Sequence, residues 1–221
     1  MSRITVSAFR WVPPFAQGLV RDLRVRWALE EAGLEYDVNL IGPDDQKSAA
    51  YRALQPFGQV PAFEQDGLAL FESCAIVMHI AEQCPALMPT EPQGRAKTRS
   101  WMLAAINTLE PPITVLTVIE LQPGGPPEGA MDMRASVLQR IQGRLDSVAA
   151  FLGDREHLID DRFSAADLLM TTVLRMLRNT DLVTKMPTLQ AYQQRCEARP
   201  AFRKALEAQL ATFAANRPPT S

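Results

Sequence analysis

The chain has 221 residues, which is enough for two small domains that each bury a hydrophobic core. Apolar residues make up 47% and charged residues 22%, which excludes wholesale disorder, and a net charge of −2 excludes a strongly basic surface for nucleic acid or anionic membranes. The amino terminus lacks the apolar segment of a signal peptide, and no apolar run approaches the roughly 18 residues of a membrane span. Three scattered cysteines fit neither a disulfide framework nor a zinc site, so we expect a cytoplasmic protein without a metal.

The first forty residues predict a β-α-β unit. Residues 4–9 alternate apolar and small polar side chains and indicate a strand, whereas adjacent prolines make residues 12–18 an expected loop. Apolar residues recur at helical spacing over 19–32, and Gly33 supplies the stop. Residues 36–41 predict a second strand, which the right-handed crossover rule makes parallel to the first.

A β-hairpin and a helix are expected next, after an irregular segment. A turn at 55–59 leads into a short strand at 60–63, and Asp66-Gly67 is typical of a tight hairpin turn into a strand at 68–71. A helix should begin near Ser73. Its apolar side is expected to contain Ala75, Ile76, His79 and Ile80.

Prolines between Cys84 and Pro92 mark a linker, so we predict domains at 1–84 and 92–221. The second domain has a helical pattern throughout except for a Pro/Gly loop at 122–129. Pro111-Pro112 should kink or break a helix, because each proline removes a backbone donor. A strand at 113–121 is the alternative.

Three short motifs resemble those of glutathione S-transferases. They are Pro56-Phe57-Gly58-Gln59-Val60-Pro61, then Phe71-Glu72-Ser73-Cys74-Ala75-Ile76, and finally Phe163-Ser164-Ala165-Ala166-Asp167. The resemblance implies an α/β thioredoxin-like N-terminal domain that binds glutathione, followed by an all-α C-terminal domain. It also implies a homodimer.

The resemblance assigns the glutathione site to two segments. It implies a cis bond before Pro61, which exposes the Val60 backbone to the cysteinyl backbone of glutathione, with Gln59 beside it. It also implies that Ser73 and its helix N-terminus hold the γ-glutamyl carboxylate, while Glu72 pairs with the ammonium group. The alternatives are a trans edge-strand proline and, for Ser73, a simple N-cap.

Ser164 and Asp167 form a variant of the capping box, and we expect a structural role for both. We therefore expect neither residue to bind glutathione or to take part in catalysis.

A transferase must also stabilise the glutathione thiolate, because the thiolate is the attacking form. Family members use Tyr, Ser or Cys near the first helix, but none of these residues occurs between Val12 and Trp27. Arg21 is the leading candidate, because a fixed cation favours the charged form. A solvated arginine, or one bound to Asp22 or another carboxylate, is the alternative. Ser7 and Trp11 are weaker candidates.

The resemblance places the second substrate, a small hydrophobic electrophile, against a helix that contains Trp101, Ala105 and Leu109. Residues of this kind are also common in a core. The predicted function is transfer of glutathione to this electrophile, or thiol exchange through the same thiolate. A glutathione-fold scaffold without activity is the alternative, favoured by the missing Tyr, Ser or Cys. An oxidoreductase using its own cysteines is disfavoured, because the sequence has no Cys-x-x-Cys.

Overall fold

The computed structural model describes residues 3–121, 130–160 and 162–218, so the predicted loop at 122–129 lies outside the described residues. The chain folds into two compact units, Met1–Met88 together with Ala198–Ser221, and Pro89–Glu197. The last helix therefore packs with the N-terminal unit, although the sequence assigned it to the helical domain. The division into domains at 84 and 92 stays a prediction.

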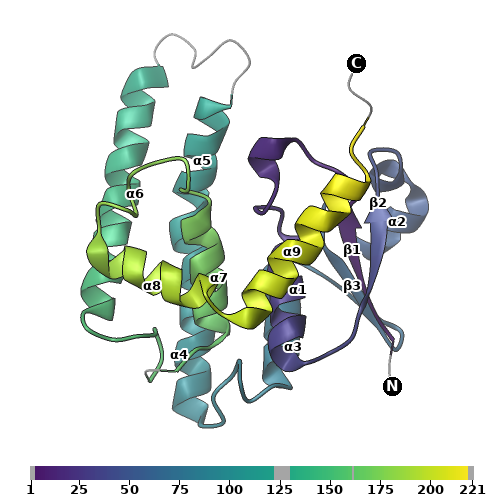
Figure 1. Cartoon of the computed structure of the whole chain (residues 1–221), viewed down its shortest axis with the longest axis horizontal. Helices are drawn as coiled ribbons and strands as arrows, with labels where there is room; N and C mark the ends of the chain where they lie inside the picture. Colours follow the sequence, from purple (N-terminus) through teal and green to yellow (C-terminus); the bar gives the residue numbers. More distant parts are fainter. Residues whose placement is uncertain (1–2, 122–129, 161, 219–221) are drawn as a thin grey trace. The chain divides into compact units, whose positions relative to one another are not determined.

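The first unit contains a four-stranded sheet in the order β2-β1-β3-β4. β1 and β2 are parallel, as predicted, and β3 is antiparallel to both β1 and β4. Figure 1 shows this sheet beside the helices of the same unit. The strands are β1 (Ile4–Phe9), β2 (Asp37–Ile41), β3 (Ala62–Gln65) and β4 (Leu68–Phe71).

The β3–β4 hairpin turns as its sequence predicts. Asp66 (φ 50°) and Gly67 (φ 83°) both have left-handed backbone conformations. Two positive φ angles in a two-residue loop are typical of a type I′ turn, whose twist matches that of the flanking strands. The predicted stop after α1 is also confirmed, because Gly33 has φ 65°.

Short helical turns lie where the sequence predicted irregular chain. A 3₁₀ turn occupies part of the proline loop, and a missed helix precedes the turn at 55–59. Ser48 caps that helix, because its Oγ accepts from the Tyr51 backbone N–H at 3.1 Å. The helical elements of this unit are η1 (Pro14–Ala16), α1 (Asp22–Ala32), η2 (Asp45–Lys47), α2 (Ala49–Leu54), α3 (Ser73–Glu82) and α9 (Pro200–Ala215).

Two helices differ in detail from their predictions. α1 begins at Asp22, three residues later than its apolar pattern suggested. α3 buries Ile76 and Ile80 but exposes Ala75, and Val77 is buried in its place. α3 packs mainly against α1.

α9 packs along α1, far from it in sequence (Figure 1). The rings of Trp27 and Phe202 meet edge to face with centroids 4.7 Å apart. The Arg199 guanidinium binds both carboxylate oxygens of Glu31, at 2.6 and 2.7 Å. A bidentate pair of this kind fixes geometry as well as adding stability.

The regular elements of the second unit are all helices within its described residues. Its centre is α7, which is buried along nearly its whole length. The predicted capping box begins this helix, with Ser164 N–H donating to Asp167 Oδ2 at 2.9 Å. The elements are α4 (Pro92–Leu103), η3 (Ala104–Leu109), α5 (Glu110–Glu120), α6 (Ala130–Leu152), α7 (Ala165–Arg175) and α8 (Pro187–Glu197).

The prolines at 111 and 112 do not end their helix. A π-helical segment, η3, precedes them, and α5 continues through them as an α-helix to Glu120. A wider π turn can accommodate proline rings that lack an N–H, so the alternative of a strand at 113–121 is wrong.

Among the described residues, the stretch Pro92–Glu120 is long and apolar enough, by length and composition, to cross a membrane. Its most apolar part is 44% buried inside the protein, and core helices of soluble proteins share this character.

Candidate functional site

A chain of hydrogen bonds holds the turn before β3. The Ala62 backbone N–H donates to Ser7 Oγ (2.6 Å), and the Tyr51 hydroxyl donates to the Gln59 carbonyl (2.6 Å). The remaining contact, 2.8 Å between Ser7 Oγ and Tyr51 Oη, is then donated by Ser7. Both hydroxyl-bearing side chains are buried. They therefore fix the backbone on each side of the two intervening residues, which gives Ser7 a structural task.

Those two residues are Val60 and Pro61, and the peptide bond between them is cis, as predicted. β3 begins at Ala62, so the Val60 backbone lies outside the strand ladder. Gln59 is exposed beside it. A backbone segment that sits next to a sheet but does not pair within it can receive an extended peptide.

The start of α3 combines an unusual backbone with a buried arginine. Glu72 is exposed and has φ 69° and ψ 112°, a rare conformation for a non-glycine residue. Ser73 is the first helical residue and is only 4% exposed, and Arg24 Nη1 donates to its Oγ at 3.3 Å. Ser73 is therefore not the N-cap. Its oxygen accepts from Arg24, and its role toward glutathione stays a prediction.

The structure brings these two segments together. The Phe57 ring, in the turn before Gln59, meets the Phe71 ring edge to face at 6.1 Å, and Phe71 immediately precedes Glu72. Ala62 also lies opposite Phe71 in the β3–β4 ladder. A ligand bound along Val60 would thus lie close to the N-terminus of α3.

The start of α1 places its two first charged residues very differently. Arg21 is the N-cap of α1 and is exposed, whereas the next residue, Asp22, is completely buried. The burial of Asp22 contradicts a surface arrangement of the two residues, and the role of Arg21 stays a prediction. The Asp22 carboxylate points inward because its partners lie there.

Asp22 is held by α1 and α9 together. Arg26 Nε donates to Asp22 Oδ2 at 2.7 Å, and Gln209 Nε2 donates to Asp22 Oδ1 at 2.7 Å and to the Val20 carbonyl at 3.2 Å. Burial raises the pKa of the Asp22 carboxyl, while the charge and hydrogen bonds of Arg26 and the amide of Gln209 lower it. Burial is the largest of these effects, so the pKa of this carboxyl lies above its ordinary value.

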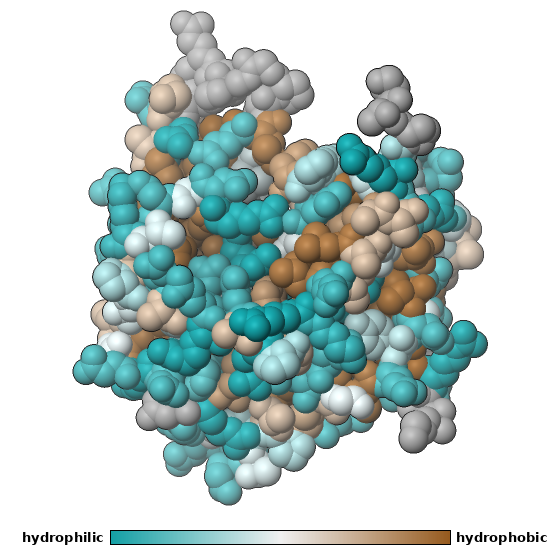
Figure 2. Space-filling view, in the orientation of Figure 1, coloured by the Kyte–Doolittle hydropathy of each residue, from teal (hydrophilic) through white to brown (hydrophobic). Residues whose placement is uncertain are grey.

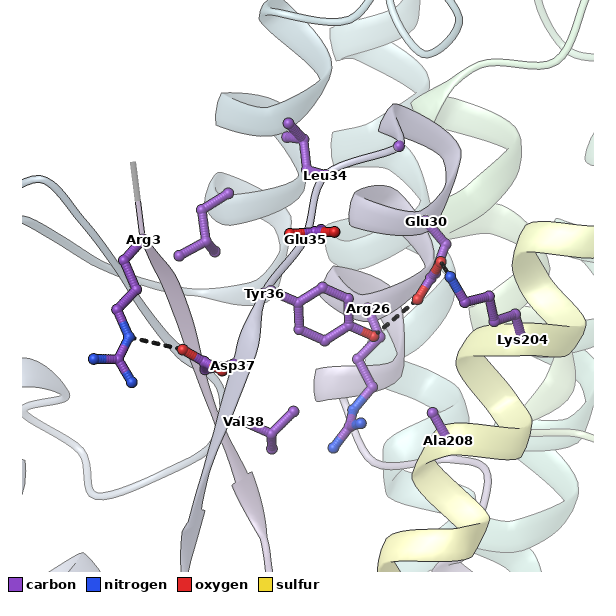
Figure 3. A pocket seen from close by; sticks show the side chains of 12 residues that line it. Arg3, Arg26, Glu30, Leu34, Glu35, Tyr36, Asp37, Val38, Lys204 and Ala208 are labelled. Atoms are coloured by element: carbon purple, nitrogen blue, oxygen red, sulfur yellow. Dashed lines mark hydrogen bonds and ion pairs between the residues drawn. The ribbon is translucent and has the colours of Figure 1, made fainter. Parts of the chain in front are cut away.

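A cleft of about 1320 Å³ lies beside this network, between α1, β2 and α9 (Figure 3). The Tyr36 hydroxyl donates to Glu30 (3.3 Å), which also pairs with Lys204 (2.6 Å), and burial raises the pKa of Tyr36 to about 12. Arg26 points into the cleft, and its Nη2 has no hydrogen-bond partner among the described residues. None of the residues predicted to bind glutathione lines this cleft.

The residues predicted to contact the electrophile are largely packed. Ala105 and Leu109 lie in η3 and are 0% and 2% exposed. Trp101 is half-buried, with its ring 4.5 Å from that of Phe151. Their role at a second-substrate pocket stays a prediction.

Sequence reasoning missed Arg24, Tyr51 and Gln209. Arg24 and Gln209 have a charged and an amide side chain, and residues of these types are mostly exposed, but all three residues are buried. Tyr51 had a usable signal, because Ser48 three residues earlier is a good N-cap. Across the described residues, no group of three or more His, Cys, Asp and Glu side chains could hold a metal ion.

Comparison with known proteins gives a consistent result. The model of the glutathione S-transferase N-terminal domain matches residues 17–82, and that of the C-terminal domain matches residues 113–200. A glutathione S-transferase from Hyoscyamus muticus is 31% identical over 200 residues, which cover 84% of this chain and 92% of the relative. Glutathione S-transferase 4 from Zea mays is 29% identical over 92% of this chain and 93% of its own length.

Solved structures agree. Poplar glutathione transferase F1 superimposes with a TM-score of 0.81 and 26% identity, over 96% of this chain and all of its own. A theta class glutathione S-transferase from Xanthomonas axonopodis pv. citri, with glutathione bound, has a TM-score of 0.76 and 27% identity over 93% of this chain and 98% of its own. From its motifs, its fold and these relatives, the chain belongs to the glutathione S-transferase family.

Proposed function

We propose that this transferase binds glutathione along the Gln59–Pro61 turn and at the start of α3, and transfers it to a small hydrophobic electrophile. The observation that carries this proposal is that an unpaired backbone segment and an oriented hydroxyl lie close together. The Val60 backbone lies outside the strand ladder, and the nearby Ser73 hydroxyl is oriented by the buried Arg24. The first would pair with the cysteinyl backbone and the second with the γ-glutamyl carboxylate.

The chemistry requires only the thiolate of glutathione. The thiol loses its proton to solvent, the sulfur attacks an electrophilic carbon, and a carbon–sulfur bond forms as a leaving group departs with its electron pair. Arg21 is the proposed stabiliser of the thiolate, because it is the exposed N-cap of α1 and its charge would favour the anion. The non-catalytic alternative gains no support from the relatives, which are named transferases.

We further propose a cytoplasmic homodimer. All three cysteines, Cys74, Cys84 and Cys196, are free thiols, which suits a reducing compartment. Phe57 is 64% exposed and meets the partly exposed Phe71 edge to face, and apolar side chains also reach the surface in Figure 2. Exposed apolar surface of this kind supports association with a second copy. Light scattering should give twice the 24.5 kDa chain mass.

The decisive experiment measures glutathione binding by calorimetry, turnover with a panel of model electrophiles, and the thiol pKa of bound glutathione from thiolate absorbance near 240 nm. We expect binding, turnover and a bound thiol that titrates below the free one. Binding without turnover by any electrophile would favour the scaffold alternative.

Arg21 is tested in the same titration. Arg21→Ala should reduce the thiolate fraction about tenfold or more at a pH below the thiol pKa, because one pKa unit corresponds to a tenfold change. Arg21→Lys should be intermediate, since it keeps the charge but not the planar fork. An alanine variant that titrates like the wild type would eliminate Arg21.

A further inference from the structure

Gln209 links the last helix of the chain to the first turn of α1. Its side chain is fully buried, and its Nε2 group donates to the Val20 carbonyl at 3.2 Å and to Asp22 Oδ1 at 2.7 Å. Val20 and Asp22 lie immediately before and after Arg21. The amide thus holds the chain on both sides of the proposed thiolate stabiliser.

The other contacts between α9 and α1 lie farther along α1. Lys204 pairs with Glu30, Arg199 with Glu31, and Phe202 with Trp27. Figure 3 shows Lys204 reaching Glu30 beside the cleft. These three contacts hold α9 against the later part of α1. Of the four α9 contacts named here, the one made by Gln209 is at the N-terminus of α1.

The orientation of the Gln209 amide follows from its neighbours. Both groups that it meets, a carbonyl and a carboxylate, are acceptors, so the NH₂ group must face them. Its Oε1 is buried without a hydrogen-bond partner among the described residues. A buried unpaired acceptor is unfavourable. The side chain therefore donates two hydrogen bonds to the start of α1, while its own oxygen accepts none from the described residues. This is unusual for a residue with only a packing role.

Asp22 transmits this constraint into the helix. Its second oxygen accepts from Arg26 Nε, one turn later, so the carboxylate joins Gln209 on one side to α1 on the other. With both oxygens occupied, Asp22 has little freedom to rotate. The first turn of α1 is then fixed in direction, and with it the Arg21 side chain and the N-terminal backbone N–H groups.

We propose that Gln209 is a positioning residue for catalysis, which orients the first turn of α1 toward the glutathione sulfur. The inference rests on the proposed function, because it concerns the same thiolate. It assigns a role in glutathione activation to a helix at the opposite end of the chain.

The test compares Gln209→Met with Lys204→Met as a matched control. Methionine keeps the length of glutamine and removes both donors, and the control removes a contact between α9 and α1 in the middle of α1. Both variants should lower the melting temperature. Only Gln209→Met should raise the thiol pKa of bound glutathione, with about a threefold smaller thiolate fraction and a similar fall in kcat/KM, because the rate follows the thiolate. The Kd for glutathione should change less than twofold.

The outcomes separate the two proposals. If the wild type binds no glutathione, or binds it without lowering the thiol pKa, the proposed function fails, and this inference fails with it. If the wild type lowers the thiol pKa but Gln209→Met titrates like Lys204→Met, only the positioning role is overturned. Should Gln209→Met not fold, Gln209→Asn replaces it. Asparagine keeps the amide without a charge but is one methylene shorter, so it cannot reach both Val20 and Asp22; the thiol pKa should rise, and an unchanged value would refute the inference.

Discussion

Replacing Ser73 by alanine tests whether this hydroxyl binds glutathione or only supports the fold. The variant removes an oxygen that is almost fully buried and accepts from Arg24 Nη1 at 3.3 Å. A hydrogen bond to a charged group contributes about 1.5–3 kcal/mol, so the Kd for glutathione should rise roughly 10- to 150-fold if Ser73 holds the carboxylate. The same change should lower the free energy of unfolding by about 1–2 kcal/mol, because Arg24 loses an acceptor.

Ser48→Ala is the matched control. Ser48 caps α2 by accepting from the Tyr51 N–H, so its loss should cost about 1 kcal/mol of stability. Ser48 is not among the residues proposed to bind glutathione. Calorimetry at one temperature gives both Kd values, and urea unfolding gives both stabilities. If the two variants bind glutathione equally well, the proposed role of Ser73 is refuted.

Three further predictions follow from buried groups. Asp22→Asn should lower the free energy of unfolding by about 3–5 kcal/mol in urea, because it leaves Arg26 buried without a counter-ion, and a loss below about 1 kcal/mol would contradict this. Tyr51→Phe should lower the free energy of unfolding by about 1 kcal/mol and weaken glutathione binding, because the Gln59 carbonyl loses its donor. Unchanged binding would show that this hydrogen bond does not support the glutathione site. The pKa of Tyr36, raised to about 12, predicts a stability contribution that is complete below pH 10 and lost as the pH rises toward 12, and Tyr36→Phe should lack this loss in alkaline unfolding experiments.

The regular elements of the sheet could be predicted because their signals are local. Alternation marks β1, the Asp66-Gly67 pair sets the hairpin, and Gly33 ends α1, since each depends on neighbours within a few residues. The cis bond before Pro61 was predicted from its motif and is present. The helix α2 was missed because six residues contain too little periodicity to stand out.

The candidate site was harder to predict because its supporting residues are buried charges. Arg24, Arg26 and Asp22 lie in α1, and charged residues normally remain exposed unless they are paired. Their burial depends on α3 and α9, which are distant in sequence: Arg24 meets Ser73, and Asp22 meets Gln209. Local spacing carries no information about partners 49 or 187 positions away.

The placement of α9 has a consequence for how the chain is made. The unit that contains the sheet consists of Met1–Met88 and Ala198–Ser221, so Pro89–Glu197 is inserted between its two parts. During synthesis from the N-terminus, all residues of the inserted unit emerge before the sheet unit has its last helix. Until then, the surface of Trp27 that meets Phe202 is uncovered. The unit that contains the sheet is therefore completed only after the whole of the inserted unit has been synthesised.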